Sequence, residues 1–192
     1  MTESEILNIF KKSGALLTGH FLLTSGRHSD RYFQCAKVLQ YPEYTELLCK
    51  MIADYFRNSN ADTVIAPAMG GLVVGQEVAR QLNKRFIFAE REDKKLSLRR
   101  GFTLDDNEKV LVCEDVVTTG GSVFEVIDIV KSNNAQVVGV GFIVDRSNGK
   151  VDFKFPQFST LKMEVVSYLP DECPLCREDI ELVKPGSRKV KV

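Results

Sequence analysis

Two adjacent carboxylates, Glu114 and Asp115, follow an apolar stretch that begins at Val110. A turn of small residues, 118–122, comes next, and apolar residues then recur at helical spacing. A strand, an acidic edge, a small-residue loop and a helix start therefore follow one another. Such a loop offers backbone N–H groups, hydroxyl donors and the positive end of a helix dipole, which together suit a phosphate group. The carboxylates repel phosphate, so they suit sugar hydroxyls or a developing positive charge.

Two other phosphate-binding motifs are excluded at this place. A Walker loop requires Gly-Lys-Ser/Thr, and a dinucleotide fingerprint requires the G-x-G-x-x-G spacing; the segment has neither. An ordinary strand–loop–helix junction with two solvated acids is the remaining alternative. A motif in its expected structural context is stronger than a bare pattern, so we favour the phosphate site.

The segment 110–122 resembles the phosphoribosyl-pyrophosphate (PRPP) signature of the type I phosphoribosyltransferases. The resemblance implies that the acidic pair holds the ribose 2- and 3-hydroxyls and that the turn wraps the 5-phosphate of PRPP. The PRPP-binding residues expected here are Glu114, Asp115, Val116, Val117, Thr118, Thr119, Gly120, Gly121 and Ser122.

A second loop, 66–71, matches the pyrophosphate loop of that family in place and in its glycines, which adds Met69, Gly70 and Gly71 to the expected PRPP site. Relatives often carry Tyr-Lys where this chain has Met69-Gly70. Pyrophosphate must then be held mainly by backbone N–H groups, which a glycine lets approach closely. A plain turn between a strand and a helix is the alternative interpretation.

The segment from Leu23 to Phe33 resembles the nucleobase-binding segment of orotate phosphoribosyltransferases. The resemblance implies that Tyr32 and Phe33 flank the flat orotate ring, since aromatic faces stack well on a planar heterocycle. Core packing is the alternative for such a pair. Thr24 departs from the Lys that many relatives have, which removes a positive contact to the substrate.

Arg146 follows the last strand of the expected core. In orotate enzymes an Arg at this place grips the substrate carboxylate, and the forked guanidinium suits that task. The resemblance also implies that Thr118 contacts orotate. A surface Arg that caps the strand end is the alternative.

A charged segment, 91–102, occupies the position of the family's mobile catalytic loop. In the family this loop reaches into the active site of the neighbouring subunit, and its cations neutralise the departing pyrophosphate. The usual Lys-x-His-Gly is absent here, and Arg91 and Lys95 are the best positional matches, so both are expected to be catalytic together with Glu114 and Asp115. Further cations lie at Lys94, Arg99 and Arg100. A solvated run of charges is the alternative.

The resemblance implies an orotate phosphoribosyltransferase activity, which joins orotate to the ribose 5-phosphate group of PRPP and releases pyrophosphate. It also implies a homodimer with shared active sites and Mg²⁺ as cofactor, carried by PRPP rather than by a dedicated protein site. Two alternatives stay open. A purine-type phosphoribosyltransferase would share the signature, and a non-enzymatic PRPP-sensing regulator would share the fold.

Bulk properties restrict the partners. The chain has 192 residues, and its 26 Lys and Arg balance its 26 Asp and Glu, so nucleic acid is not expected as a partner. Apolar runs are too short for a membrane span, and the amphipathic N-terminus is unlike a signal peptide. We expect no membrane association and a cytoplasmic location.

The five cysteines are an odd number, which favours reduced thiols over a disulfide framework. Cys173 and Cys176 form a lone C-x-x-C, whereas a structural zinc site needs four ligands. The two histidines, His20 and His28, lie far upstream. A packed turn is therefore expected around Cys173, and no metal ligands are expected in the chain.

Strands and helices alternate from about residue 41 to 145, which predicts an α/β fold with a parallel sheet and helices on both faces. Ligands of such sheets bind beyond the carboxyl ends of the strands. The whole chain is expected to form one phosphoribosyltransferase domain with a core over 41–146. Residues 1–40 and 147–192 are expected to build a small hood. Strands are expected at 20–23, 32–38, 63–66, 85–89 and 136–144 besides the signature strand, with loops at 67–71, 90–100 and 114–122.

Overall fold

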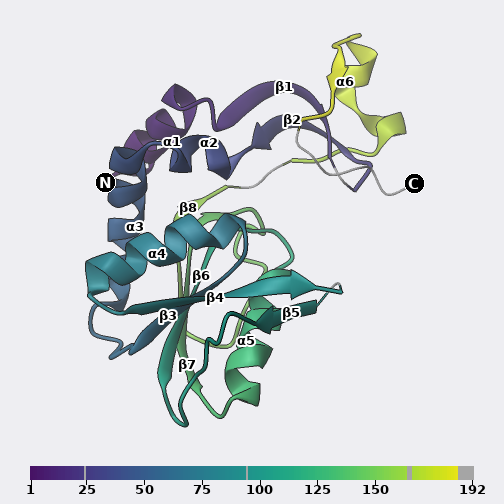
Figure 1. The fold of residues 1–192 in the computed structure, drawn as a ribbon. Helices are drawn as coiled ribbons and strands as arrows, with labels where there is room; N and C mark the ends of the chain where they lie inside the picture. The colour runs from purple at the N-terminus through teal and green to yellow at the C-terminus, as the bar shows by residue number, and fades with distance from the viewer. Residues whose placement is uncertain (24, 94, 164–165, 186–192) are drawn as a thin grey trace. The chain divides into compact units, whose positions relative to one another are not determined.

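The computed structural model describes residues 1–23, 25–93, 95–163 and 166–185 (Figure 1). The chain divides into two compact units. The core unit comprises Leu39–Met163, and the terminal unit comprises residues 1–38 and 164–192. Within the described part of the chain, every helix is too short or too polar to cross a bilayer.

The core unit is built on a six-stranded sheet with the order β5-β4-β3-β6-β7-β8. Neighbouring strands pair in parallel except β4 and β5, which form an antiparallel hairpin. The strands are β3 (Thr63–Pro67), β4 (Arg85–Glu92), β5 (Lys95–Leu98), β6 (Lys109–Val117), β7 (Gln136–Asp145) and β8 (Gln157–Lys162). The helices are α3 (Pro42–Phe56), α4 (Gly70–Leu82) and α5 (Gly121–Ser132).

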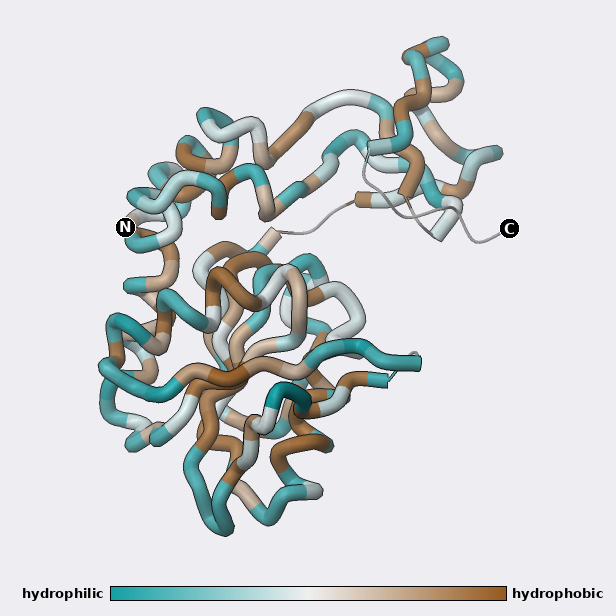
Figure 2. The backbone as a smooth tube through the Cα atoms, in the orientation of Figure 1, coloured by the Kyte–Doolittle hydropathy of each residue, from teal (hydrophilic) through white to brown (hydrophobic). Residues whose placement is uncertain are grey.

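Alternating residues of β7 show that helices cover both faces of the sheet. A Cβ added at Gly139 would meet Phe56, and one at Gly141 would meet Ile52, so α3 packs closely on that face. The intervening Val140 belongs to a buried cluster that includes apolar residues of α5. Because successive residues of a strand point to opposite faces, α3 and α5 lie on opposite sides. The apolar colouring of the central strands in Figure 2 agrees with this sandwiched position.

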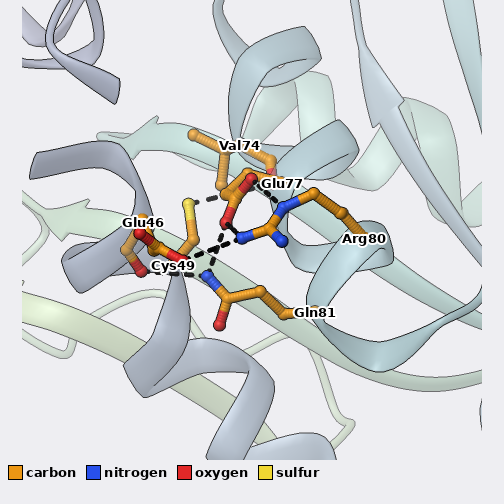
Figure 3. Close-up of polar contacts among 6 residues, drawn as sticks. All are labelled: Glu46, Cys49, Val74, Glu77, Arg80 and Gln81. Carbon is orange, nitrogen blue, oxygen red and sulfur yellow. Dashed lines mark hydrogen bonds and ion pairs between the residues drawn. The ribbon is translucent and has the colours of Figure 1, made fainter. Parts of the chain in front are cut away.

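Helices α3 and α4 are joined by a polar seam (Figure 3). Arg80 donates to both carboxylate oxygens of Glu77, each at 2.8 Å, and also to Glu46 of α3 at 3.0 Å. The Cys49 thiol lies 3.9 Å from the carbonyl oxygen of Val74. These contacts hold α4 against α3, so the loop 67–71 leads into a helix whose position is fixed.

The terminal unit has a three-stranded sheet of order β2-β1-β9. Its strands are β1 (Leu16–Leu22), β2 (His28–Phe33) and β9 (Leu182–Val183). Helix α1 (Glu3–Lys12) begins with a capping box, in which Thr2 and Glu5 satisfy each other's backbone N–H groups. A short helix α2 (Cys35–Leu39) follows β2, and the C-terminal part holds a 3₁₀ turn η1 (Pro170–Glu172) and α6 (Pro174–Arg177).

Three expectations about the elements were wrong. The strand expected over 32–38 ends at Phe33, and α2 follows it. The charged segment expected as a loop over 90–100 is largely the β4–β5 hairpin, which makes the sheet mixed rather than wholly parallel. Leu96 is buried in that hairpin and Leu98 is half-buried, so a two-residue alternation was present among the charges.

The expected end of the core at residue 146 was also too early. Strand β8 pairs in parallel with β7, from Val140 opposite Gln157 to Asp145 opposite Lys162. Residues 147–163 therefore belong to the core unit rather than to a hood. Long-range pairing decides this assignment, because the β8 segment has little apolar periodicity of its own.

Candidate active site

Glu114 lies near the carboxyl end of β6 and is only 5 % exposed. The Ser122 hydroxyl donates to one of its carboxylate oxygens at 2.7 Å, and the backbone N–H of Asp115 donates to the other at 3.0 Å. Ser122 belongs to the first turn of α5. Glu114 therefore ties the strand end to the start of the helix and fixes the small-residue turn between them.

Burial is the main cause that raises the pKa of Glu114 to about 8, and the neighbouring Asp115 carboxylate adds to it. The neutral form of Glu114 is thus favoured at neutral pH, and the pair carries less than two full negative charges. Asp115 is half-buried, and its side chain accepts from the N–H of Val116 at 2.8 Å. The more exposed Asp115 is the member of the pair that can meet a ligand.

The loop 67–71 lies directly against the acidic pair. A Cβ added at Gly70 would come within 2.7 Å of the Asp115 carboxyl group, and one at Gly71 would come within 3.1 Å of Glu114 Oε1. Any larger residue at position 70 would displace Asp115 or the loop. The structure thus brings together two of the expected PRPP segments, and Met69 of the loop is 81 % exposed.

The turn before α5 has the geometry of an anion site. Gly120 has a φ of 76° and is so close to Phe153 that an added Cβ would lie 2.8 Å from its ring, so two constraints require glycine here. Helix α5 begins at the next residue, and the first N–H groups of a helix have no partner within the helix. Thr118 and Thr119 are exposed beside them. Backbone and hydroxyl donors are therefore available to one phosphate group.

Arg146 is fixed next to this turn. Asp145 pairs with Val117 across β6 and β7, and the N–H of Arg146 donates to the Val117 carbonyl at 2.8 Å. Its side chain is half-buried. Thr118 and Arg146, the expected orotate-binding residues, therefore follow the carboxyl ends of two neighbouring strands, β6 and β7.

Asp145 is a positioning residue that our sequence analysis did not identify. It is 2 % exposed, and its carboxylate accepts from the N–H and the hydroxyl of Ser147 and from the N–H of Gly149, at 2.7–3.0 Å. This network holds the loop that carries Arg146. The pattern Asp-x-Ser-x-Gly after a buried strand was the available signal, since Asp side chains commonly bind the backbone just ahead of them.

The hairpin cations are not simply solvated. Arg91 forms a two-bond ion pair with Glu125 of α5, at 2.8 and 3.2 Å, and Glu125 also accepts from the N–H of Leu96. The hairpin therefore packs on the helix that follows the turn 118–122. Lys95 is exposed at the start of β5, and Lys94 lies outside the described residues.

The aromatic pair belongs to the terminal unit. Phe33 is 5 % exposed and packs edge-on against Phe10 with ring centres 5.9 Å apart, which fits the core-packing alternative. Tyr32 is half-buried, and its hydroxyl donates to Gln34 at 3.1 Å. Of the two rings, Tyr32 has more surface left for a ligand. Thr24, the expected departure from the family, lies outside the described residues.

Comparisons with known proteins identify the family of the chain. The phosphoribosyl transferase domain family matches residues 36–170. The chain is 62 % identical over 188 residues to an orotate phosphoribosyltransferase of Chlorobaculum parvum, covering 98 % of this chain and 97 % of that protein. It is 57 % identical over 190 residues to one of Desulforamulus reducens, covering 99 % of this chain and all of that protein.

Solved structures show the same fold. The crystal structure of an orotate phosphoribosyltransferase from Aeropyrum pernix superposes with a TM-score of 0.72 at 25 % identity, covering 82 % of this chain and 93 % of that one. An adenine phosphoribosyltransferase from Thermoanaerobacter pseudethanolicus reaches 0.61 at 18 % identity, covering 69 % of this chain and 88 % of that one. The fold is thus shared by proteins named for different bases, and the higher sequence identity is to proteins named for orotate.

Proposed function

Because this chain belongs to the phosphoribosyl transferase family, and within it to the orotate phosphoribosyltransferases, we propose that the edge formed by β6, β7 and the loop 67–71 is where it joins orotate to PRPP. The products are orotidine 5-phosphate and pyrophosphate, on the route to UMP. One observation carries the assignment of the site: the loop 67–71 packs against the acidic pair, and Glu114 of that pair accepts a hydrogen bond from Ser122 of the turn 118–122.

The acidic pair serves the ribose of PRPP. Asp115 accepts hydrogen bonds from the ribose hydroxyls, and Glu114 holds Asp115 and Ser122 in place from its buried position. Ribosyl transfer passes through a state with oxocarbenium character, as at other glycosidic centres. A carboxylate close to the ring stabilises that charge more than it stabilises the neutral ground state, so it accelerates the reaction. A covalent nucleophile is not required.

The two loops divide the phosphate groups of PRPP. The turn 118–122 holds the 5-phosphate with backbone N–H groups at the start of α5. The loop 67–71 holds pyrophosphate, also through its backbone. Arg91 and Lys95 of the hairpin then balance the negative charge that grows on departing pyrophosphate. Without substrate Arg91 is paired with Glu125, so this role requires Arg91 to leave the Glu125 carboxylate and pair with a phosphate group of PRPP.

Mg²⁺ is proposed as the cofactor, carried by PRPP. The residues fit a substrate-borne ion better than a dedicated cage, because Glu114 is buried and already accepts two hydrogen bonds. That leaves Asp115 as the one carboxylate of the pair able to approach a PRPP-bound ion. When bound, the ion neutralises pyrophosphate oxygens and makes pyrophosphate a better leaving group.

Orotate is proposed to lie beside Thr118 with its carboxylate on Arg146, and Tyr32 is kept as the proposed stacking partner of its ring. Burial of Phe33 assigns that residue to packing. A purine-type activity is less consistent with relatives that are 54–62 % identical and named for orotate. A PRPP-sensing regulator would have no need for an Arg at the base site.

A steady-state assay with four bases tests the function. With PRPP and Mg²⁺, orotate is expected to be converted, whereas uracil, hypoxanthine and adenine are expected to react at least about 10²-fold more slowly in kcat/KM. Uracil is the sharpest comparison because it lacks only the carboxylate. Faster turnover of a purine would establish the purine alternative. Failure of all four bases, with PRPP still bound, would establish the regulator.

A homodimer with shared active sites is proposed, in which the hairpin of one protomer serves its partner. Lys95→Ala and Asp115→Asn should each lower turnover by at least about tenfold, the scale of one lost charge interaction. If sites are shared, each mixed dimer has one site with neither substitution. An equal mixture with random pairing should then recover about a quarter of wild-type activity.

Differently tagged protomers confirm that mixed dimers form. Lys84→Ala is the matched control for charge removal, because Lys84 is an exposed Lys outside the hairpin and should leave activity unchanged. If verified mixed dimers are no more active than either parent, each chain works with its own hairpin and sharing is wrong.

The cellular setting is proposed to be the cytoplasm, without a nucleic-acid or membrane partner. None of the five cysteines, all of which the structure describes, is in a disulfide, which suits a reducing compartment. The balanced charge of the chain gives no basic field that would attract nucleic acid.

A further inference from the structure

Four metal-binding side chains meet in the terminal unit: His20 of β1, His28 at the start of β2, Cys173, and Cys176 of α6. Their ligand atoms all lie within 4.8 Å of one another. The expectation of a packed turn at Cys173 and Cys176 rested on the distance of the histidines along the chain, but these residues are close in space. The β1–β2 hairpin and the C-terminal segment bring both pairs together.

The distances within this cluster are close to those of a tetrahedral site. Zinc with bonds of about 2.3 Å to sulfur and about 2.05 Å to nitrogen places tetrahedral ligands about 3.3–3.8 Å apart. The Nε2 atom of His20 lies 3.5 Å from the sulfur of Cys173 and 3.7 Å from that of Cys176. The Cys176 sulfur lies 3.2 Å from Nδ1 of His28, and the two ring nitrogens are 2.9 Å apart. One ion at the centre requires the two ring nitrogens to move apart and the widest pair of ligand atoms, within 4.8 Å, to move closer.

The orientation of His20 supports the same conclusion. Its Nδ1 atom lies 2.7 Å from the carbonyl oxygen of Ile180, which can only accept, so Nδ1 carries the proton. The lone pair is then on Nε2, which faces both sulfurs. In zinc sites a ligating histidine usually binds the metal through one ring nitrogen and donates the N–H of the other to a carbonyl or carboxylate.

We propose that His20, His28, Cys173 and Cys176 bind one structural Zn²⁺ ion. Two thiolates and two imidazoles are a ligand set typical of tetrahedral zinc. All four positions come from the protein, so the site is closed and does not activate water. Three of the ligands are buried and Cys176 is exposed, which leaves a path for the ion to enter.

The ion would stabilise the terminal unit across a long chain separation. His20 and Cys173 are 153 residues apart, and β9, the C-terminal strand that pairs with β1 at His20, has only two residues. Coordination of one ion by both segments adds a second link to this short strand pairing. It also anchors the start of β2, the strand that carries Tyr32. We therefore expect zinc to set the stability of this unit rather than the chemistry of transfer.

The rival interpretation is a metal-free cluster in which the thiols and imidazoles hydrogen-bond to one another or the thiols form a disulfide. Metal content separates these states. Protein purified without a chelator and without a metal-affinity column should contain about one zinc ion per chain, as measured by inductively coupled plasma mass spectrometry. Zinc-free protein refilled with Co²⁺ should show the intense visible absorption of tetrahedral cobalt with thiolate ligands.

Cys176→Ser is the variant of choice, since Cys176 is exposed and its change disturbs packing least. It should retain less than about a tenth of the zinc, and its melting temperature should fall by at least about 5 °C. Cys35→Ala is the matched control, a cysteine of the same unit outside the cluster, and should keep its zinc.

The wild-type protein decides the question even if the variant does not fold. Removal of zinc by a chelator under reducing conditions should lower the melting temperature, and added Zn²⁺ should restore it. Wild-type protein that holds no zinc, takes none up on titration and gives no cobalt spectrum would overturn the proposal. A Cys173–Cys176 disulfide or stoichiometric iron in its place would do the same.

Discussion

Thr119→Glu is expected to abolish PRPP binding, with an affinity loss of at least about 10³-fold. The substitution puts a carboxylate among the donors at the start of α5, where the 5-phosphate is proposed to lie. Two unit charges about 4 Å apart repel by about 4 kcal/mol near a protein surface, and a phosphate dianion increases that cost. Thr119 is exposed, so the fold should tolerate the change. Isothermal titration calorimetry with PRPP and Mg²⁺ measures the loss.

Thr119→Gln is the matched control, because glutamine has the size of glutamate without its charge. It should weaken PRPP binding far less than Thr119→Glu does. Similar melting temperatures for both variants would exclude unfolding as the cause. Unchanged PRPP affinity in the glutamate variant would refute the assignment of this turn to phosphate.

Arg146→Ala is expected to lower orotate kcat/KM by about 10²-fold, from the loss of a charge-assisted pair worth about 2–3 kcal/mol. PRPP affinity should change much less, because the turn and the acidic pair are untouched. The backbone of Arg146 is held by Val117 and its loop by Asp145, so the loop should survive loss of the side chain. Orotate kinetics measured beside PRPP titration separate the two effects.

Arg146→Lys completes the experiment. Lysine keeps the charge but lacks the planar fork, so orotate activity should lie between those of wild type and the alanine variant. Uracil should be used about equally poorly by all three proteins, since it has no carboxylate to pair. If Arg146→Ala loses orotate and PRPP equally, a folding defect explains the result. If orotate kinetics are unchanged, Arg146 only caps the strand end.

The sequence by itself was sufficient to identify the family and to predict where phosphate binds. The chemistry of residues 110–122 is local: the strand, the two acids, the turn and the helix start lie in thirteen consecutive positions, so one stretch contains both the ligand groups and their geometry. The alternation of strands and helices predicted the parallel core, because each element shows its own periodicity. The family and the alternating strands and helices of the core were confirmed by the comparisons and the fold, whereas the phosphate site stays a prediction.

Two features that depend on residues close in sequence were missed, although the sequence contained a signal for each. The β4–β5 hairpin was missed because its alternation of Leu96 and Leu98 is short and surrounded by ions. The role of Asp145 was missed because a buried acid at a strand end resembles a ligand-binding residue as much as a loop cap.

Only the tertiary structure decided which distant residues meet. Strand β8 joined the sheet through pairing with β7 rather than through its own pattern, and Gly70 met Asp115 through parallel neighbours that are 45 positions apart. The four proposed zinc ligands are the extreme case, since His20 and Cys173 are close only because β1 and the C-terminal segment pack together. Local periodicity reports how a segment folds, whereas partners far along the chain are selected by packing and hydrogen bonding summed over the whole unit.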